Sequence, residues 1–211
     1  TLTFSHAIWS AGAFDTLGLF PGNDTPGVIG PRALYRLLTR DGLDVNGQRV
    51  LVIGSGLDFW LSSALLARRG AQVSLVVTGP GWQSALSAAV DLGWQLTTGL
   101  QLANIRTHGQ NGVEATFVPR HSSPGPAHTH LSLQADFAVV AGRGKPVYDI
   151  PYQLGVDLSL QPDRGGFIPR ETANGRSSVE LAPGTRLTMV GEAAGNLPEE
   201  QADPSRKAAT K

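Results

Sequence analysis

The chain has 211 residues, the length of one domain or of one domain with part of a second. Its 17 Lys and Arg balance 17 Asp and Glu, which argues against a broad basic surface for nucleic acid or anionic lipid. The absence of cysteine excludes disulfides, thiolate metal sites, cysteine nucleophiles and Cys-x-x-Cys redox centres. No apolar run reaches the roughly 18 residues of a membrane span. We therefore expect a cytoplasmic protein that binds neither membrane nor nucleic acid.

In the first part of the chain, apolar runs alternate with amphipathic segments that are bounded by Pro and Gly. The predicted elements, in chain order, are a short buried strand at 6–13, a turn-rich loop at 20–27, a helix at 31–42, a strand at 49–54, a helix from about 58 to 69 that ends at Gly70, and a strand at 71–77.

The second part begins with another helical pattern and then alternates apolar and polar residues with the period of antiparallel strands. The predicted elements are a helix at 83–93, a short strand at 93–99, a meander of three strands at 100–109, 112–120 and 128–135, a buried parallel strand at 135–144, a short helix at 151–158 and a buried strand at 185–195.

Alternating strands and helices favour a parallel sheet, because parallel strands need long crossover connections. The order therefore predicts an α/β fold built on a doubly wound sheet. More specifically, we expect a Rossmann-like three-layer nucleotide-binding domain with a central parallel sheet and an antiparallel β-meander flap.

The stretch RVLVIGSGLDFW, residues 49–60, has the strand, glycine turn and helix of a dinucleotide site. Gly54 and Gly56 occupy the first two positions of Gly-x-Gly-x-x-Gly, where they permit a tight turn and a close approach of the backbone to a pyrophosphate. Together with Ser55 and Leu57 they would present backbone groups to that pyrophosphate at a helix N-terminus.

Three features depart from this pattern. The third glycine is replaced by Phe59, which we expect to crowd the contact between helix and strand, and Asp58 would repel a pyrophosphate if it faced the cleft. The acidic residue that usually follows the next strand and binds a ribose is also missing, and Thr78 would approach the ribose instead. The sequence leaves an occupied site and a vestigial one as open alternatives.

Other candidate chemistry is weaker. His121, His128 and His130 lie in a Pro- and Gly-rich segment that we interpret as a solvated hairpin loop, and we expect no metal site. No nucleophile-elbow pattern indicates a hydrolase. The sequence indicates no catalytic acid or base, and the catalytic residues stay unknown.

Three segments carry a resemblance to a known family: HAIWSAGAFDTLGLFPGNDTPGV at 6–28, ADFAVVAGRGKP at 135–146, and GGFIPRETANGRSSVELAPGTRLTMVGEAAG at 165–195. In this order they resemble the FAD/NAD(P)-binding pyridine nucleotide-disulfide oxidoreductase superfamily. The similarity is closest to the α-subunits of heteromeric sarcosine and opine oxidases and of hydroxyproline dehydrogenases. It covers about residues 7–195.

The resemblance implies cofactors and a partner. NAD(P) would bind this chain, whereas FAD would bind only with the N-terminal FAD-binding half, which this sequence lacks, or with a flavoprotein chain that supplies that half. Gly142 would border the nicotinamide side. Gly12, Gly191 and Glu192, together with Ala11, would line the flavin side, although the family usually has Asp in place of Glu192.

The resemblance also implies a division of the chain. Residues 1–42 would be a crossover segment and the edge of an FAD domain, 43–150 the NAD(P)-binding domain, 151–195 a return segment to the FAD domain, and 196–211 a flexible tail.

The predicted function is a nucleotide-binding domain or subunit of a flavin-dependent oxidoreductase. It would pass electrons between FAD and either NAD(P)H or an amine or amino-acid substrate. The alternative is a non-catalytic scaffold subunit with a vestigial Rossmann site in a flavoenzyme complex. The substrate, the choice between NAD and NADP and the stoichiometry stay open.

Overall fold

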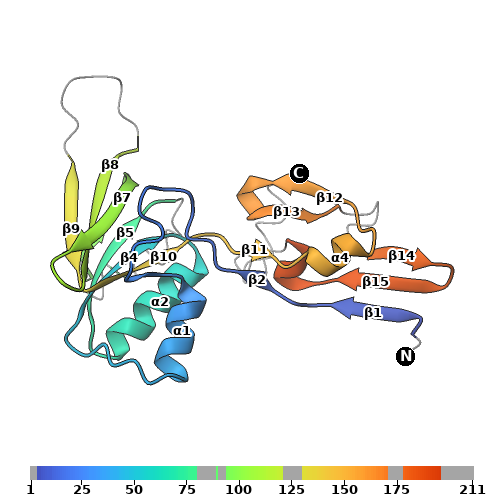
Figure 1. The fold of residues 1–211 in the computed structure, drawn as a ribbon, viewed down its shortest axis with the longest axis horizontal. Helices are drawn as coiled ribbons and strands as arrows, with labels where there is room; N and C mark the ends of the chain where they lie inside the picture. Colours follow the sequence, from blue (N-terminus) through green and yellow to red (C-terminus); the bar gives the residue numbers. More distant parts are fainter. Residues whose placement is uncertain (1–3, 80–88, 90–93, 121–129, 171–177, 196–211) are drawn as a thin grey trace. The chain divides into compact units, whose positions relative to one another are not determined.

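A computed structural model describes residues 4–79, 89, 94–120, 130–170 and 178–195 (Figure 1). The chain divides into two compact units. The larger unit runs from Asp15 to Gly142, and the smaller contains the described residues up to Phe14 and from Arg143 onward. This boundary differs from the division expected at residues 42 and 150, and the functional assignment of those segments stays a prediction.

The larger unit is built on a parallel sheet of five strands, in the order β3-β10-β4-β5-β6. The strands are β3 (Val28–Ile29), β10 (Phe137–Ala141), β4 (Arg49–Gly54), β5 (Gln72–Val77) and β6 (Leu96–Thr97). Gly54 pairs with Ala141 on one side and with Val77 on the other, so the carboxyl ends of the three central strands lie in one row.

Two helices, α1 (Pro31–Thr39) and α2 (Leu57–Arg68), cover one face of this sheet (Figure 1). Val50 and Val52 of β4 face the helices, whereas the alternate residues Leu51 and Ile53 face the opposite side. Because both faces of β4 are covered, its sequence is a continuous apolar run rather than an alternating one.

The antiparallel strands β7 (Leu100–His108), β8 (Gly112–Pro119) and β9 (Leu131–Ala135) cover the other face, through residues such as Phe117. The predicted three-layer fold with a central parallel sheet and an antiparallel meander is therefore confirmed, and the meander forms the layer on this face. A doubly wound sheet would have helices there. The connections from β3 through β4 to β5 all advance in the same direction, so right-handed crossovers place both helices on one side.

The outer face of the meander carries a charged cluster around Glu114, whose side chain is only 11% exposed. Its carboxylate accepts hydrogen bonds from Arg106 (2.8 Å) and Gln134 (3.3 Å), and His108 Nδ1 lies 3.4 Å away. The Arg106 hydrogen bond is the main cause that holds the pKa of Glu114 below its ordinary value.

We expect Glu114→Gln to reduce the loss of stability in acid. A carboxyl with a lowered folded-state pKa contributes stability above its unfolded pKa, about 4.3, and loses it as the pH falls through the lower folded pKa. Urea denaturation between about pH 6 and 2 should show a shallower decline for Glu114→Gln and for Arg106→Gln than for the original chain. Equal slopes would contradict this assignment.

The smaller unit contains a three-stranded sheet in the order β1-β15-β14. β1 (His6–Trp9) pairs in parallel with β15 (Thr185–Met189), and β14 (Ser178–Ala182) pairs antiparallel with β15. Around a small core lie two antiparallel pairs and three short helices. They are β2 (Ala13–Phe14) with β11 (Lys145–Pro146), β12 (Leu158–Gln161) with β13 (Gly166–Pro169), α4 (Asp149–Gln153), η1 (Pro162–Arg164) and η2 (Gly191–Ala194).

Most of the strands and helices predicted in the described residues are confirmed, but the burial of the first strand is wrong. β1 alternates between exposed and half-buried residues, and Ile8 is 67% exposed. Ala7 and Trp9 pack against the small core, whereas the alternate residues His6 and Ile8 lie on the opposite face of the sheet, where the described residues form no core cluster. The predicted helix at 83–93 lies outside the described residues except for Ala89, and the tail at 196–211 lies wholly outside them. None of the described helices is long and apolar enough to cross a membrane.

Candidate functional site

The turn after β4 has the backbone geometry that its glycines predict. Gly54 has φ 143°, and a side chain there would collide with the carbonyl oxygen of Ala141 on the neighbouring strand. Gly56 has φ 83° and forms the N-cap of α2 without a side-chain hydrogen bond. The N-terminal amides of α2 therefore begin directly at this turn, next to Leu57, which is the arrangement that suits an anionic ligand.

The end of β5 lies against the same turn. The Thr78 amide donates a hydrogen bond to the Gly54 carbonyl at 3.0 Å. The Ser55 side chain fills the space that a side chain at Gly79 would need. Gly79 was not predicted as a site residue. Position 79 must be glycine because of Ser55, which is 24 positions away in the sequence, so no local pattern indicates it.

Gly142 follows β10 in the same row of strand ends, and a side chain there would collide with the carbonyl oxygen of Thr16. The six residues predicted for the nucleotide side thus lie at the carboxyl ends of three neighbouring strands. This edge is where α/β sheets bind ligands. The six residues are Gly54, Ser55, Gly56, Leu57, Thr78 and Gly142.

Phe59 does not crowd the helix as the sequence suggested. It is fully buried in the layer between α2 and the sheet, and its ring meets the Trp60 ring edge to face at 4.8 Å between centroids. The aromatic ring has become a core residue, so the helix needs no third glycine to pack against the sheet.

No local signal in the sequence indicated the group that faces Asp58. Arg32, near the start of α1, has its Nη1 atom 3.7 Å from Asp58 Oδ2 and 3.0 Å from Asp15 Oδ1. Asp15 also accepts hydrogen bonds from the backbone amides of Arg32 (2.9 Å) and Ala33 (3.3 Å), two of the first amides of α1, which have no partner within the helix. Sequence separations of 17 and 26 residues leave no local pattern that would predict this arrangement.

The residues predicted for the flavin side come together in the smaller unit. Gly12 follows β1 and Gly191 follows β15, and these two strands are parallel neighbours. A Cβ atom at Gly12 would lie 3.7 Å from Glu192 Oε2, and both glycines have positive φ angles of 74° and 64°. The carboxyl ends of this strand pair therefore carry the expected turn residues and one carboxylate.

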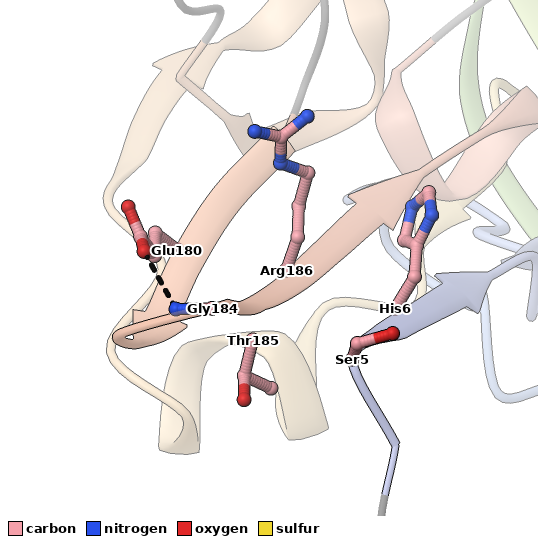
Figure 2. Close-up of a pocket in the computed structure, with 6 residues that line it drawn as sticks. All are labelled: Ser5, His6, Glu180, Gly184, Thr185 and Arg186. Atoms are coloured by element: carbon pink, nitrogen blue, oxygen red, sulfur yellow. Dashed lines mark hydrogen bonds between the residues drawn. The ribbon is translucent and has the colours of Figure 1, made fainter.

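Two of the surface hollows that the described residues line have similar volumes. One, of about 260 Å³, lies between α1 and α2, has the exposed side chains of Tyr35 and Leu61 on its walls, and is also lined by Arg32 and Asp58. The other, also about 260 Å³, lies on the smaller unit at the start of β1 and at the turn between β14 and β15 (Figure 2). Its lining residues are Ser5, His6, Glu180, Gly184, Thr185 and Arg186.

The hollow of Figure 2 contains none of the predicted site residues. His6 Nε2 is hydrogen-bonded to Thr188 Oγ1 at 2.9 Å, and Glu180 accepts a hydrogen bond from the Gly184 amide at 3.0 Å. The His6 bond joins β1 to β15, and the Glu180 bond stabilises the turn between β14 and β15.

In the part of the chain that the structure describes, no three His, Asp or Glu side chains are grouped as metal ligands. His130 is exposed, and His121 and His128 lie outside the described residues.

No family model and no curated protein matches this sequence. Solved structures do match it. Thioredoxin reductase from T. acidophilum has a TM-score of 0.61 at 14% identity, over 89% of this chain. Histamine dehydrogenase from Rhizobium sp. 4-9 has a TM-score of 0.55 at 15% identity, over 92% of this chain. The water-forming NADH oxidase from Lactobacillus brevis, bound to NADH, has a TM-score of 0.50 at 16% identity, over 74% of this chain.

This chain shares their fold. The fold that the predicted resemblance implies is thus confirmed, whereas membership of the superfamily and the closer similarity to sarcosine and opine oxidases stay predictions. The chain spans 60% of the thioredoxin reductase, 33% of the NADH oxidase and 28% of the histamine dehydrogenase.

Proposed function

We propose that the chain is the nucleotide-binding domain or subunit of a flavin-dependent oxidoreductase. The observation that carries the proposal is the turn from Gly54 to Gly56, which leads into the start of α2 and is closed by Thr78 and Gly79 at the end of β5. Gly54 is buried against Ala141 of β10 and shapes the turn, whereas the half-buried Gly56 leaves the start of α2 without a side chain at that position, as the approach of a pyrophosphate requires.

These residues fit a pyridine dinucleotide. The backbone of Gly54, Ser55, Gly56 and Leu57 would hold its pyrophosphate, and Thr78 would hydrogen-bond a ribose hydroxyl. Gly142 would border the nicotinamide, because it follows β10, on the other side of β4 from β5. When bound, NAD(P)H supplies the hydride chemistry, and the contribution of this chain is binding and orientation.

The choice between NAD and NADP depends on the group at the end of β5. Thr78 and Gly79 carry no charge, so at these positions the protein neither repels a 2′-phosphate with a carboxylate nor binds it with an arginine. We therefore expect the two cofactors to bind this edge with similar affinities.

Under this proposal, FAD binding needs a partner domain or chain that supplies the FAD-binding half. Of the twelve large apolar side chains that are exposed among the described residues, nine belong to the smaller unit. They are Phe4, Ile8, Phe14, Ile150, Tyr152, Leu154, Leu160, Phe167 and Val190. This excess supports a flavoprotein domain or chain that covers the smaller unit and supplies the FAD-binding half. Gly12, Gly191 and Glu192 would then face the flavin.

The electron partner of the flavin would be NAD(P)H or an amine or amino-acid substrate. The solved neighbours support both electron partners. One neighbour is an NADH oxidase bound to NADH, and another is a histamine dehydrogenase.

A scaffold subunit with a vestigial nucleotide site is the second candidate. Its supports are the carboxylate of Asp58 beside the glycine turn and the uncharged end of β5. Phe59 no longer supports it, because the ring is fully buried in the core cluster that joins α2 to the sheet.

We expect Gly56→Val to weaken NADH and NADPH binding by about tenfold or more, because a β-branched residue is strained at φ 83° and displaces the backbone that would approach the pyrophosphate. Calorimetric titration of the folded 211-residue chain, alone and with its flavin partner, measures the effect. Gly42→Val is the matched control, since Gly42 has φ 71° but open space around it. If neither cofactor binds the original chain in either form, the scaffold function replaces this proposal.

A further inference from the structure

Asp58 presents an electrostatic problem to the proposed nucleotide site. It lies in the first turn of α2, two residues after Gly56, so its carboxylate is near the helix end where a pyrophosphate would bind. Two negative groups at one helix N-terminus compete for the same partial positive charge and repel each other. A chain that binds dinucleotides at this turn therefore needs a group that offsets Asp58.

Arg32 is held in place to do this. Asp15 accepts hydrogen bonds from both the backbone amide and the guanidinium of Arg32, at 2.9 and 3.0 Å. A side chain at Gly30 would overlap the Asp15 carboxylate, so the glycine makes room for this contact. A residue fixed through both its backbone and its side chain loses little further entropy when it meets a second partner.

The second partner of Arg32 is Asp58. Arg32 Nη1 lies 3.7 Å from Asp58 Oδ2, across the contact between α1 and α2. The two side chains are 37% and 32% exposed, so water screens the attraction only in part. The attraction draws the carboxylate toward α1.

We propose that Arg32 is a positioning residue that holds the Asp58 carboxylate toward α1 and offsets its charge, so that the glycine turn accepts an anionic dinucleotide. The inference rests on the proposed function, since it concerns the same turn. Arg32 acts through Asp58 and need not touch the ligand. The sequence alone leaves open whether Asp58 prevents a pyrophosphate from binding, and under this proposal Arg32 removes that obstacle.

A double-mutant cycle tests the proposal. The dissociation constant of NADH is measured by calorimetry for the original full-length chain, Arg32→Gln, Asp58→Asn and the double variant. Arg32→Gln should weaken binding by about tenfold, because it exposes the Asp58 charge, whereas Asp58→Asn should bind as tightly as the original chain or more tightly. In the double variant the affinity should return to within about threefold of Asp58→Asn, because no charge is left to offset.

Arg36→Gln is the matched control, since Arg36 lies on the same helix and pairs with Asp41 at 3.9 Å. It removes the same charge from α1 and should leave NADH affinity unchanged. Thermal unfolding of each variant shows how much of any loss reflects damage to α1.

The other outcomes overturn the proposal in distinguishable ways. If Arg32→Gln weakens NADH binding equally in the original chain and in the Asp58→Asn variant, Arg32 binds the phosphate directly and the proposed role is wrong. If Arg32→Gln lowers stability but leaves affinity unchanged, the ion pair is structural only. If the folded original chain binds neither NADH nor NADPH, alone or with its flavin partner, the proposed function fails, and this inference fails with it.

Discussion

Replacing Gly54 with Ala is expected to destabilise the larger unit by on the order of 4 kcal/mol, a large part of the stability of an ordinary domain. Two effects add. At φ 143° the backbone lies in a region that residues with a Cβ rarely adopt, which costs about 2 kcal/mol. The new methyl group would also meet the backbone of Ala141 on β10, and separating two hydrogen-bonded central strands costs about 2 kcal/mol more.

Urea denaturation, followed by circular dichroism, measures this change. The control is Gly42→Ala, which replaces a glycine at φ 71° with nothing within 4 Å of the added carbon, and which should cost only about 1 kcal/mol. Equal effects of the two substitutions would show that the contact between β4 and β10 is looser than the structure has it, and that Gly54 serves only the turn.

The sequence predicted this turn because its signals are local. The apolar run of β4, the two glycines and the helical pattern that follows lie within 20 consecutive residues, and each has a physical meaning that needs no partner. For the same reason the central strands and both described helices of the larger unit could be predicted with bounds close to those observed. The turn residues of the smaller unit, Gly12 and Gly191, came instead from the family resemblance.

The features that the sequence could not predict depend on contacts between elements that are distant in the chain. The group formed by Asp15, Arg32 and Asp58 spans 44 positions of the chain and joins a loop to two helices. No periodicity links such residues, so Asp58 appeared as an isolated charge. The requirement for glycine at Gly79 likewise comes from Ser55, on a different loop.

Exposure in the smaller unit is a further limit. The apolar sequence of β1 indicates burial, but the described residues place only one layer against it, and Ile8 stays exposed. An apolar pattern reports what a strand is suited to contact, not whether that contact belongs to the same chain. Under the proposed function, the missing contact is the flavoprotein half.

Phe59 shows the same limit within the larger unit. The third glycine of the dinucleotide pattern permits a close approach of helix and strand. Whether that approach is needed depends on the distance between α2 and the sheet, which the whole layer of side chains determines. Phe59 contributes to that layer with Leu66 of the same helix, Leu34 of α1 and Val52 of the sheet, and all four are fully buried.

Phe59→Ala is therefore expected to destabilise the larger unit by about 3–5 kcal/mol, the usual cost of removing a fully buried phenyl ring and leaving a cavity. Leu61→Ala is the control on the same helix, because Leu61 is 56% exposed and its loss should cost less than about 1 kcal/mol. Denaturation in urea measures both changes. If Phe59→Ala were neutral or stabilising, the ring would be crowding the helix after all, and the missing third glycine would again argue for a vestigial site. The expected result is that Phe59→Ala loses much stability and that the fraction that stays folded keeps its NADH affinity. This result would show that Phe59 fills the space between α2 and the sheet and so takes the structural place of the third glycine.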